Sequence, residues 1–306
     1  MRRFLSEVAF RAKPPTVTTK LQEWKRLFEE HNISEPQPSA EFIISHVLGK
    51  KTYGQISHAD RRRVLDAIEI TEIDNLCKKR LTKLPIQYVI EEWDFSKLTL
   101  KMKPPVFIPR PETEELVKLV CDDINLSPTS RFSLLEVGCG SGAISLAVLH
   151  SLKHKQIHKN LFITAIDKDE KAVRLMEENA DHTKLNSYNL KVFTSDIRCF
   201  SETKQCKYDG LVSNPPYIPT NDMKSLQPEI SLYESEISLH GGTEGLDVIK
   251  EILDAAKHLL KTGGWIRMEV DASHPKLLKN FNSNFYLDKV EKDFLDRERF
   301  VKLIKM

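Results

Sequence analysis

Glycine is scarce in this sequence, so the places where it occurs are informative. Only 11 of the 306 residues are glycine, about half the share found in an average protein. Three lie within 138–142, three within 241–245 and two at 263–264. Because glycine serves where the backbone needs a positive φ or comes close to a ligand, we expect these clusters to stand where the fold or a ligand demands them.

Cysteine pairs, long apolar runs and excess charge are also lacking. The five cysteines are odd in number and form no CxxC pair, which argues against a disulfide framework and a zinc site and fits a reducing compartment. No apolar run approaches the roughly 18 residues of a membrane span. The net charge is +2, from 46 basic and 44 acidic residues. We therefore predict neither membrane insertion nor stable nucleic-acid binding.

The first 17 residues form a basic, acid-poor segment. Arg2, Arg3, Arg11 and Lys13 stand against a single acidic residue, Glu7, and the apolar residues between them can share one face of a helix. An Arg-rich amphipathic start is typical of a mitochondrial transit peptide, and no continuous apolar core follows, as it would in a secretory signal. We predict a transit peptide at 1–17, with a frayed basic terminus as the alternative.

Two changes of periodicity divide the rest of the chain. From 18 to 90 apolar residues recur at helical spacing, which predicts a small helical N-terminal domain. It shows no catalytic cluster, so a packed accessory domain is the default interpretation and substrate docking is the role to test. Residues 91–108 alternate enough to predict a β-hairpin linker.

After residue 130, apolar runs alternate with helical stretches. This rhythm is typical of a mostly parallel sheet covered by helices on both faces. We therefore predict an α/β fold with a doubly wound sheet for the domain at 109–306. The expected strands, with helices between the first five, are 133–137, 161–166, 190–193, 210–212, 265–268 and 300–304.

The first glycine cluster follows an expected strand and precedes an expected helix. Its E-x-G-x-G-x-G spacing differs from the G-x-G-x-x-G of dinucleotide-binding proteins and suits a ligand that lacks a pyrophosphate. Two further strands end in acids: Asp167 can accept both hydroxyls of a ribose, and Asp196, beside Ile197, can accept the amino group of adenine. Together they predict an S-adenosylmethionine site, with a structural turn and solvated acids as the alternative. The predicted cofactor-binding residues of the turn are Gly138, Cys139, Gly140, Ser141 and Gly142.

The most specific motif is Asn214-Pro215-Pro216-Tyr217, which follows the fourth expected strand. The prolines make the turn rigid and leave two carbonyls without local amide donors. The Asn214 side-chain oxygen and one carbonyl can each accept an N–H from a planar NH2 group, against which Tyr217 can stack. They would place the nitrogen lone pair along a sulfonium methyl, without prior proton removal. We predict Asn214, Pro215 and Tyr217 as catalytic, Pro216 as substrate-binding, and Asn214 as a cofactor contact as well.

Arg110 and a series of histidines need separate interpretations. Residues 109–115 predict a helix start, with proline and acids in its first turn. Arg110 is not explained by capping, so we expect it to line the substrate site. His150, His154 and His158 have the i, i+4, i+8 spacing of a metal site, but the lysines between them would repel a cation. We interpret them as a solvated helix end and predict no metal.

At this point the sequence resembles the HemK/PrmC family of release-factor glutamine N5-methyltransferases over nearly its whole length after about residue 18. The family has a helical N-terminal domain, a β-hairpin and a class I (Rossmann-like) methyltransferase domain. The NPPY segment is shared with other amino-group methyltransferases, whereas FIPRPETE at 107–114 together with GGTEGL at 241–246 is much narrower. The strand that carries Glu269 also matches.

The resemblance implies a substrate, a partner and a location. The substrate would be the glutamine side-chain amide of a GGQ motif in a class I peptide chain release factor, held by Asn214 and Pro215 with Tyr217 beside it. The glycine turn, Asp167 and Asp196 would hold S-adenosylmethionine. With the basic N-terminus, the chain is similar to mitochondrial members, so we expect it in the mitochondrial matrix.

Three departures from the family pattern fall outside the loops expected to do chemistry. Glu91 and Glu92 stand where a glycine is expected, Ser235 replaces a common proline, and Asp271 replaces a common glycine. They bear on the fit of the substrate more than on the reaction.

Two other functions compete with glutamine methylation. An adenine-N6 methyltransferase of DNA or RNA would need a basic recognition surface and a pocket for a flipped base. The near-neutral N-terminal region and the lack of a large insertion after Tyr217 weigh against it. A cofactor-binding assembly protein without catalysis is the second alternative, and the intact NPPY motif weighs against that one.

Overall fold

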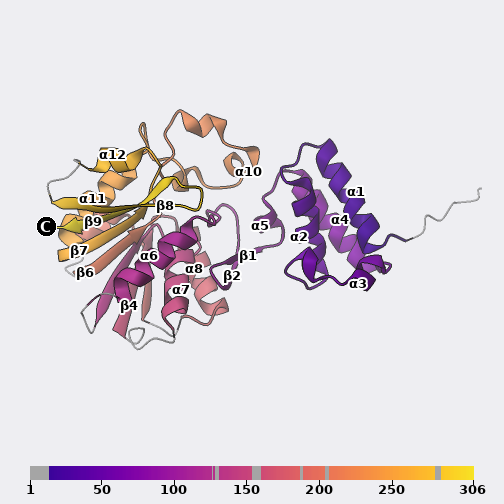
Figure 1. The fold of residues 1–306 in the computed structure, drawn as a ribbon, viewed down its shortest axis with the longest axis horizontal. Helices are drawn as coiled ribbons and strands as arrows, with labels where there is room; N and C mark the ends of the chain where they lie inside the picture. Colours follow the sequence, from indigo (N-terminus) through magenta and orange to yellow (C-terminus); the bar gives the residue numbers. More distant parts are fainter. Residues whose placement is uncertain are drawn as a thin grey trace, which may run out of the picture. The chain divides into compact units, whose positions relative to one another are not determined.

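The computed structural model describes residues 14–125, 127, 131–153, 160–186, 189–203, 207–279 and 284–306. The chain forms two compact units, Met1–Ile90 and Glu91–Met306 (Figure 1). Most of the predicted transit peptide, residues 1–13, lies outside the described residues. Its last four residues are described, and of these Thr16 caps the first helix and Val17 is fully buried. In the described part, no helix has both the length and the apolar character needed to cross a bilayer.

The N-terminal unit is a bundle of helices. Capping boxes define two of the starts, with Thr16 and Asp66 as the N-caps, because each side chain accepts backbone N–H groups that a helix leaves unpaired. Lys20 is buried and forms a 2.7 Å ion pair with Asp74, which also accepts the Trp24 indole N–H. The α-helices are α1 (Val17–Glu30), α2 (Pro36–Val47), α3 (His58–Arg62), α4 (Ala67–Leu81) and α5 (Ile86–Val89).

The second unit begins with a short antiparallel hairpin, β1 (Glu92–Phe95) and β2 (Leu98–Lys101). Glu91 has a φ of 58°, a conformation that favours glycine, which explains why a glycine was expected there. The segment from 102 to 108, predicted as part of the hairpin, forms no strand. The helix predicted from Pro109 begins only at Thr113, so both nearby prolines precede it.

A seven-stranded sheet forms the centre of the second unit. Its strand order is β5-β4-β3-β6-β7-β9-β8; the five strands from β5 to β7 are parallel, and β9 and β8 are antiparallel additions. This order confirms the predicted α/β, doubly wound class. The strands are β3 (Phe132–Val137), β4 (Leu161–Asp167), β5 (Leu190–Thr194), β6 (Tyr208–Ser213), β7 (Leu260–Glu269), β8 (Phe285–Lys292) and β9 (Glu298–Lys305).

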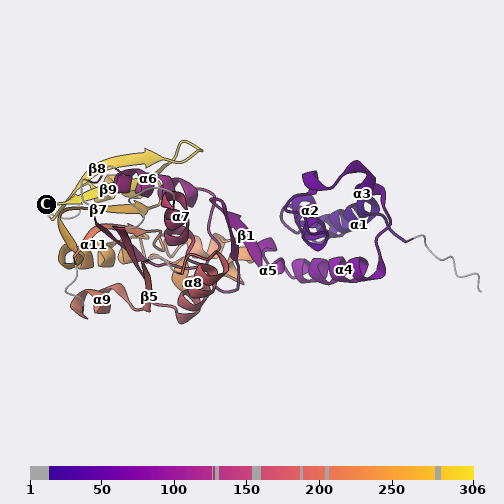
Figure 2. The same cartoon turned by 90° about the horizontal axis from the view of Figure 1, so that it is seen from below.

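Helices cover both faces of this sheet. Figure 2 shows α6 and α7 on one face and α9 and α11 on the other. Between them lies a core of strand residues such as Leu135, Ile166, Leu211 and Met268, all fully buried. The helices are α6 (Thr113–Asn125), α7 (Ala143–Leu152), α8 (Glu170–His182), α9 (Ile197–Thr203), α10 (Pro228–Ser231), α11 (Asp247–Leu259) and α12 (His274–Leu278).

One strand, β8, was not predicted. Four of its eight residues are charged, and all but Phe285 are at least partly exposed, since it lies at the edge of the sheet with one neighbour, β9. Edge strands of this kind carry charges rather than continuous apolar runs. The apolar signal used for the other strands was therefore absent here.

Candidate active site

The turn after β3 adopts the conformation that its glycines permit. Gly138, Gly140 and Gly142 have φ values of 75°, 53° and 83°, which residues with a Cβ rarely adopt. Gly142 also lies against α8, since a Cβ there would come within 2.7 Å of the Met176 side chain. The turn therefore brings backbone, rather than side chains, to the carboxyl end of β3.

Asp167 ends the neighbouring strand β4 and is tied to the same turn. Its carboxylate accepts hydrogen bonds from the backbone N–H groups of Gly140 and Asp169, both at 2.9 Å. Burial raises the pKa of Asp167, and the two backbone bonds oppose that shift. The carboxylate is thus held in place while each oxygen keeps capacity to accept a further donor.

Asp196 follows β5 and completes this row of strand ends. One carboxylate oxygen, Oδ1, accepts from the backbone N–H and the Nε–H of Arg198, at 2.9 and 3.2 Å. Burial would raise the pKa of Asp196, but these bonds outweigh it and leave the pKa below its ordinary value. Asp196 is therefore an ionised acceptor at the cavity.

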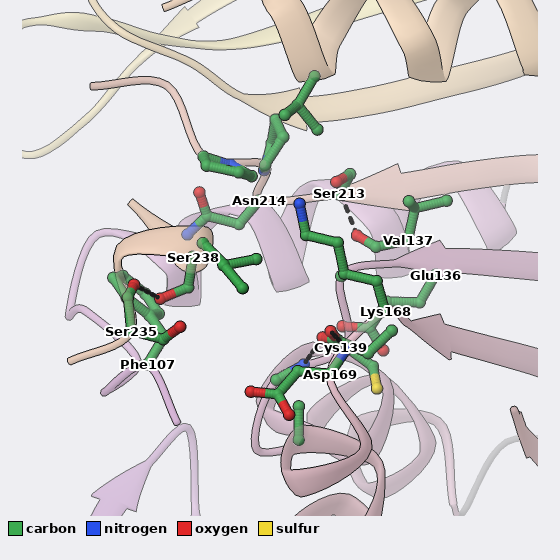
Figure 3. A pocket seen from close by; sticks show the side chains of 18 of the residues that line it. Phe107, Glu136, Val137, Cys139, Lys168, Asp169, Ser213, Asn214, Ser235 and Ser238 are labelled. Atoms are coloured by element: carbon green, nitrogen blue, oxygen red, sulfur yellow. Dashed lines mark hydrogen bonds between the residues drawn. The ribbon is translucent and has the colours of Figure 1, made fainter. Parts of the chain in front are cut away.

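A single cavity of about 250 Å³ joins these strand ends to the NPPY segment. Figure 3 shows Glu136, Cys139 and Asp169 on one side of it, and Asn214, Ser238 and Phe107 on the other. Of the predicted site residues, Gly142 alone is not in its lining. Those that line it are Arg110, Gly138, Cys139, Gly140, Ser141, Asp167, Asp196, Ile197, Asn214, Pro215, Pro216 and Tyr217.

The NPPY segment leaves β6 as a tight elbow beside the glycine turn. Ser213 Oγ donates to the Val137 carbonyl at 2.7 Å, which joins the ends of β6 and β3. The Asn214 side chain donates through Nδ2 to Thr113 Oγ1 at 3.2 Å. Within the described residues, Asn214 Oδ1 and the carbonyls of Asn214 and Pro215 accept no hydrogen bond. The elbow therefore presents uncommitted acceptors in the wall of the cavity.

The second glycine cluster packs behind this elbow. A Cβ on Gly241 would lie 2.7 Å from the Pro216 carbonyl oxygen, and one on Gly245 would lie 2.1 Å from that of Tyr217. Backbone bonds between Ile218 and the 239–241 segment hold the two loops together, at 3.0 and 2.9 Å. Only residues without a side chain fit this close approach, so the cluster supports the shape of the elbow.

Tyr217 belongs to a buried polar network that the sequence did not reveal. Its hydroxyl donates to Glu269 Oε1 at 3.3 Å and accepts from Arg299 Nη2 at 2.5 Å. The Arg299 guanidinium also bonds Glu269 at 3.1 Å and stacks over the Tyr217 ring, 4.7 Å from its centroid. Burial, together with the nearby Glu269 carboxylate, raises the pKa of Tyr217 to about 12. Tyr217 is therefore held in position as a neutral phenol.

Arg110 lines the cavity but is already paired. Its guanidinium donates to Glu234 Oε1 at 2.6 Å and stacks over the Phe107 ring. The other oxygen of Glu234 accepts the backbone N–H of Ile108 at 3.2 Å. Arg110 thus connects the segment before α6 to the segment after α10. If the guanidinium contacts substrate, it does so while it is ion-paired with Glu234.

Glu136 also lines the cavity, and the sequence analysis assigned it no role. It is the second-last residue of β3 and is fully buried, and its Oε2 accepts from the backbone N–H and hydroxyl of Ser145. Its Oε1 is buried and has no partner within the described residues. Burial raises the pKa of Glu136 to about 8, so this acid is unsatisfied until a donor or a cation enters the cavity.

The histidine series lies mostly outside the described residues, so its interpretation as a solvated helix end stays a prediction. His150 lies at the end of α7, and His154 and His158 lie outside the described residues. Elsewhere in the described ranges, no three His, Cys, Asp or Glu side chains converge as a metal site would require.

Comparisons with known proteins decide the family. A model described as "PrmC N-terminal domain" matches residues 19–90, and one described as "Methyltransferase small domain" matches residues 118–229. "MTRF1L release factor glutamine methyltransferase" of Homo sapiens is 40% identical over 91% of this chain and 84% of its own length. The chain belongs to the release factor glutamine methyltransferase family.

Bacterial members of the family are also similar over most of their length. A "Release factor glutamine methyltransferase" of Thermodesulfovibrio yellowstonii is 33% identical, covering 90% of this chain and 93% of the relative. One of Geobacter sulfurreducens is 30% identical, covering 82% and 83%. These matches confirm the predicted resemblance and the prediction of an enzyme.

Release factor glutamine methyltransferases use S-adenosylmethionine, so membership confirms the predicted cofactor. The cavity fits that group. Asp167 and Asp196 offer acceptors at adjacent strand ends, and the unpartnered Glu136 oxygen suits a ligand that carries positive charge. Among the described residues, the basic side chains of the lining are Arg110 and Lys168, and Arg110 is paired with Glu234.

Proposed function

We propose that this protein methylates the side-chain nitrogen of the glutamine in the GGQ motif of a class I peptide chain release factor. One observation carries the proposal: the acceptors of the NPPY elbow are uncommitted in the same cavity as the glycine turn and Asp167. A carboxamide is planar and offers two N–H donors, which complements two fixed acceptors. The cofactor would supply a methyl group on a sulfonium and leave as the thioether.

The elbow would act by position and polarisation. An amide nitrogen is a poor nucleophile because its lone pair is delocalised into the carbonyl. Two acceptors on its hydrogens, Asn214 Oδ1 and a backbone carbonyl, would direct the lone pair towards the methyl carbon and favour the developing positive charge on nitrogen. No histidine lines the described cavity, and its lysine, Lys168, is exposed. The extra proton would leave to solvent after transfer.

The substrate side of the cavity favours a polypeptide over a nucleic acid. Its wall includes Ile230, Ile237 and Leu239, and Ile237 is 54% exposed. Arg110, the one arginine among the described residues of this wall, is paired with Glu234. Nucleic-acid binding depends on several cations free to meet phosphates, and this wall has an apolar character instead.

A parallel assay tests the proposal against its main competitor. The purified protein would be given labelled S-adenosylmethionine with a class I release factor, the same factor with the GGQ glutamine changed to alanine, and a single-stranded oligonucleotide rich in adenine. We expect label only in the intact factor, located at the glutamine by mass spectrometry. Label in the oligonucleotide, or in the alanine variant, would reject the proposal.

We also propose that the protein works in the mitochondrial matrix. The basic, acid-poor segment at the N-terminus supports this location, because such segments are typical of mitochondrial transit peptides. Because Thr16 caps α1 and Val17 is buried, removal of the segment should occur before Thr16. A fluorescent protein carrying residues 1–30 should enter mitochondria, and the same fusion with Arg2, Arg3 and Arg11 changed to glutamate should stay in the cytosol. Equal distribution of both fusions would contradict the location.

A further inference from the structure

Thr113, the first residue of α6, connects the elbow to a buried acid. Its Oγ1 accepts from Asn214 Nδ2 at 3.2 Å and donates to Glu269 Oε2 at 2.7 Å. Thr113 is 2% exposed and Glu269 is 1% exposed. Both bonds are therefore largely shielded from water, where a polar side chain is strongly held to its partners.

Glu269 fixes which atoms donate and which accept in the series of hydrogen bonds from Asn214 through Thr113 to Glu269. A carboxylate only accepts, and a threonine hydroxyl has a single proton to give. Glu269 Oε1 is occupied by Arg299 and Tyr217, and Oε2 takes the proton of Thr113. Only the lone pairs of the Thr113 oxygen then face Asn214, so only the NH2 end of the Asn214 amide can meet it.

We infer that Thr113, anchored by Glu269, is a positioning residue that sets which end of the Asn214 amide faces the substrate. The oxygen and nitrogen ends of an amide have nearly the same shape, so hydrogen bonding alone distinguishes them. With NH2 committed to Thr113, Oδ1 turns away from it, and it has no partner among the described residues. A flipped amide would bring NH2 against the substrate NH2, and the acceptor would be lost. The inference rests on the proposed function.

Substitution of Thr113 tests this role. Thr113→Val keeps the shape but leaves the Asn214 NH2 without its acceptor, so we expect kcat for the release factor to fall about 10- to 100-fold. The KM for S-adenosylmethionine and its affinity by calorimetry should change less than about twofold. Thr113→Ser restores the hydroxyl and should recover most of kcat. Thr164→Val, on β4 away from the cavity, is the matched control.

Glu269→Gln gives a sharper second test, which also serves if Thr113→Val does not fold. Arg299 and Tyr217 require an acceptor at one end of the new amide, so its NH2 must face Thr113. The Thr113 proton would then turn to Asn214 Oδ1 and favour the flipped amide. We expect a similar loss of kcat from this nearly isosteric change, and little further loss when Thr113→Val is added.

Double substitution separates positioning from general damage. In an Asn214→Ala background, Thr113→Val should cost less than about twofold, because the group that it orients is gone. Equal losses from Thr113→Val in both backgrounds, or a kcat of Thr113→Val alone within twofold of the unsubstituted enzyme, would overturn the inference. Failure of the unsubstituted protein to methylate the release factor would instead reject the proposed function, so the two failures are distinct.

Discussion

The two sides of the cavity are built by different means. On the glycine side, the backbone of the 138–142 turn and a strand-end acid hold each other, as in the bond from Gly140 to Asp167 across 27 positions. On the elbow side, side chains from distant segments hold the NPPY residues. Thr113 lies 101 positions from Asn214, and Arg299 lies 82 from Tyr217.

This difference predicts which property, cofactor affinity or turnover, a substitution on each side lowers. A change on the glycine side removes a direct acceptor and should weaken cofactor affinity while turnover at saturation survives. A change on the elbow side should lower turnover and leave cofactor affinity intact, because the network around Glu269 supports Asn214 and Tyr217 rather than the glycine turn. Each of the four variants below tests that separation.

Asn214→Ala should have the largest effect. It removes one of the two acceptors that polarise the substrate amide, and the loss of one such preorganised group costs about 10²–10³ in kcat. Steady-state kinetics with the release factor measure the loss of kcat, and calorimetry measures any loss of cofactor affinity. Asn221→Ala is a control, since that exposed asparagine makes no side-chain cap. Loss of cofactor affinity as large as the loss of kcat would mean that the two sides are not separate.

Asp167→Asn should have the next largest effect, on the other side. The new NH2 group must face either Gly140 N–H or Asp169 N–H, and the negative charge is lost. Charge-assisted hydrogen bonds contribute about 1.5–3 kcal/mol, so the dissociation constant of S-adenosylmethionine should rise about 10- to 150-fold. At saturating cofactor, kcat should stay within about threefold. Asp181→Asn, on the exposed surface of α8, controls for the loss of a charge.

The same contrast explains what could be predicted from the sequence. The glycine turn, Asp167, Asp196 and the NPPY motif follow directly after strands, and parallel strands place their carboxyl ends at one edge. Their shared cavity was therefore predictable from the order of elements. The pairing of Glu234 with Arg110 was not, because no periodicity relates residues 124 positions apart.

Glu269 and Arg299 show a second reason for what was missed. Both are charged residues in strands β7 and β9, which are neighbours in the sheet. A charged residue in a strand is normally expected to face solvent, whereas Glu269 is 1% exposed and Arg299 is 9% exposed. Only the antiparallel pairing of β9 with β7 brings Arg299 beside Glu269 and Tyr217. The apolar run at 300–304 predicted the strand β9, but nothing in the neighbouring residues showed that it pairs with β7.

Tyr217→Phe should have a smaller effect on the elbow side. It removes the hydroxyl between Arg299 and Glu269 but leaves their direct ion pair and the aromatic ring. The change removes two hydrogen bonds to charged groups, but Arg299 and Glu269 keep each other as partners. The net loss should therefore stay near that of one ordinary hydrogen bond, about 0.5–1.5 kcal/mol, and kcat should fall about 3- to 10-fold with cofactor affinity unchanged. Phe200→Leu, in the core between α9 and the sheet, gives a comparison for a purely structural change. A shift in cofactor affinity without a change in kcat would contradict the assignment of Tyr217 to the elbow.

Glu136→Gln should show the smallest effect, and only as a dependence on pH. Burial raises the pKa of Glu136 to about 8, so in the free protein this acid is mostly neutral at pH 7. A positively charged ligand favours the ionised form and lowers that pKa, so cofactor affinity should rise with pH up to about 8 and then level off. A shift of about half a pKa unit on binding corresponds to about threefold in affinity.

The Glu136 experiment measures the affinity for S-adenosylmethionine from about pH 6.5 to 8.5 in the unsubstituted protein and in Glu136→Gln. Asp167, the acid that acts electrostatically on Glu136, keeps its two backbone bonds in the unsubstituted protein and in Glu136→Gln. Burial raises the pKa of the Cys139 thiol well above its ordinary value and above this pH range. Glu136→Gln cannot ionise, so its affinity should be flat. S-adenosylhomocysteine, which lacks the sulfonium charge, should show a weaker pH dependence with the unsubstituted protein. An unchanged slope in Glu136→Gln would assign the titration to another group and remove Glu136 from the glycine side.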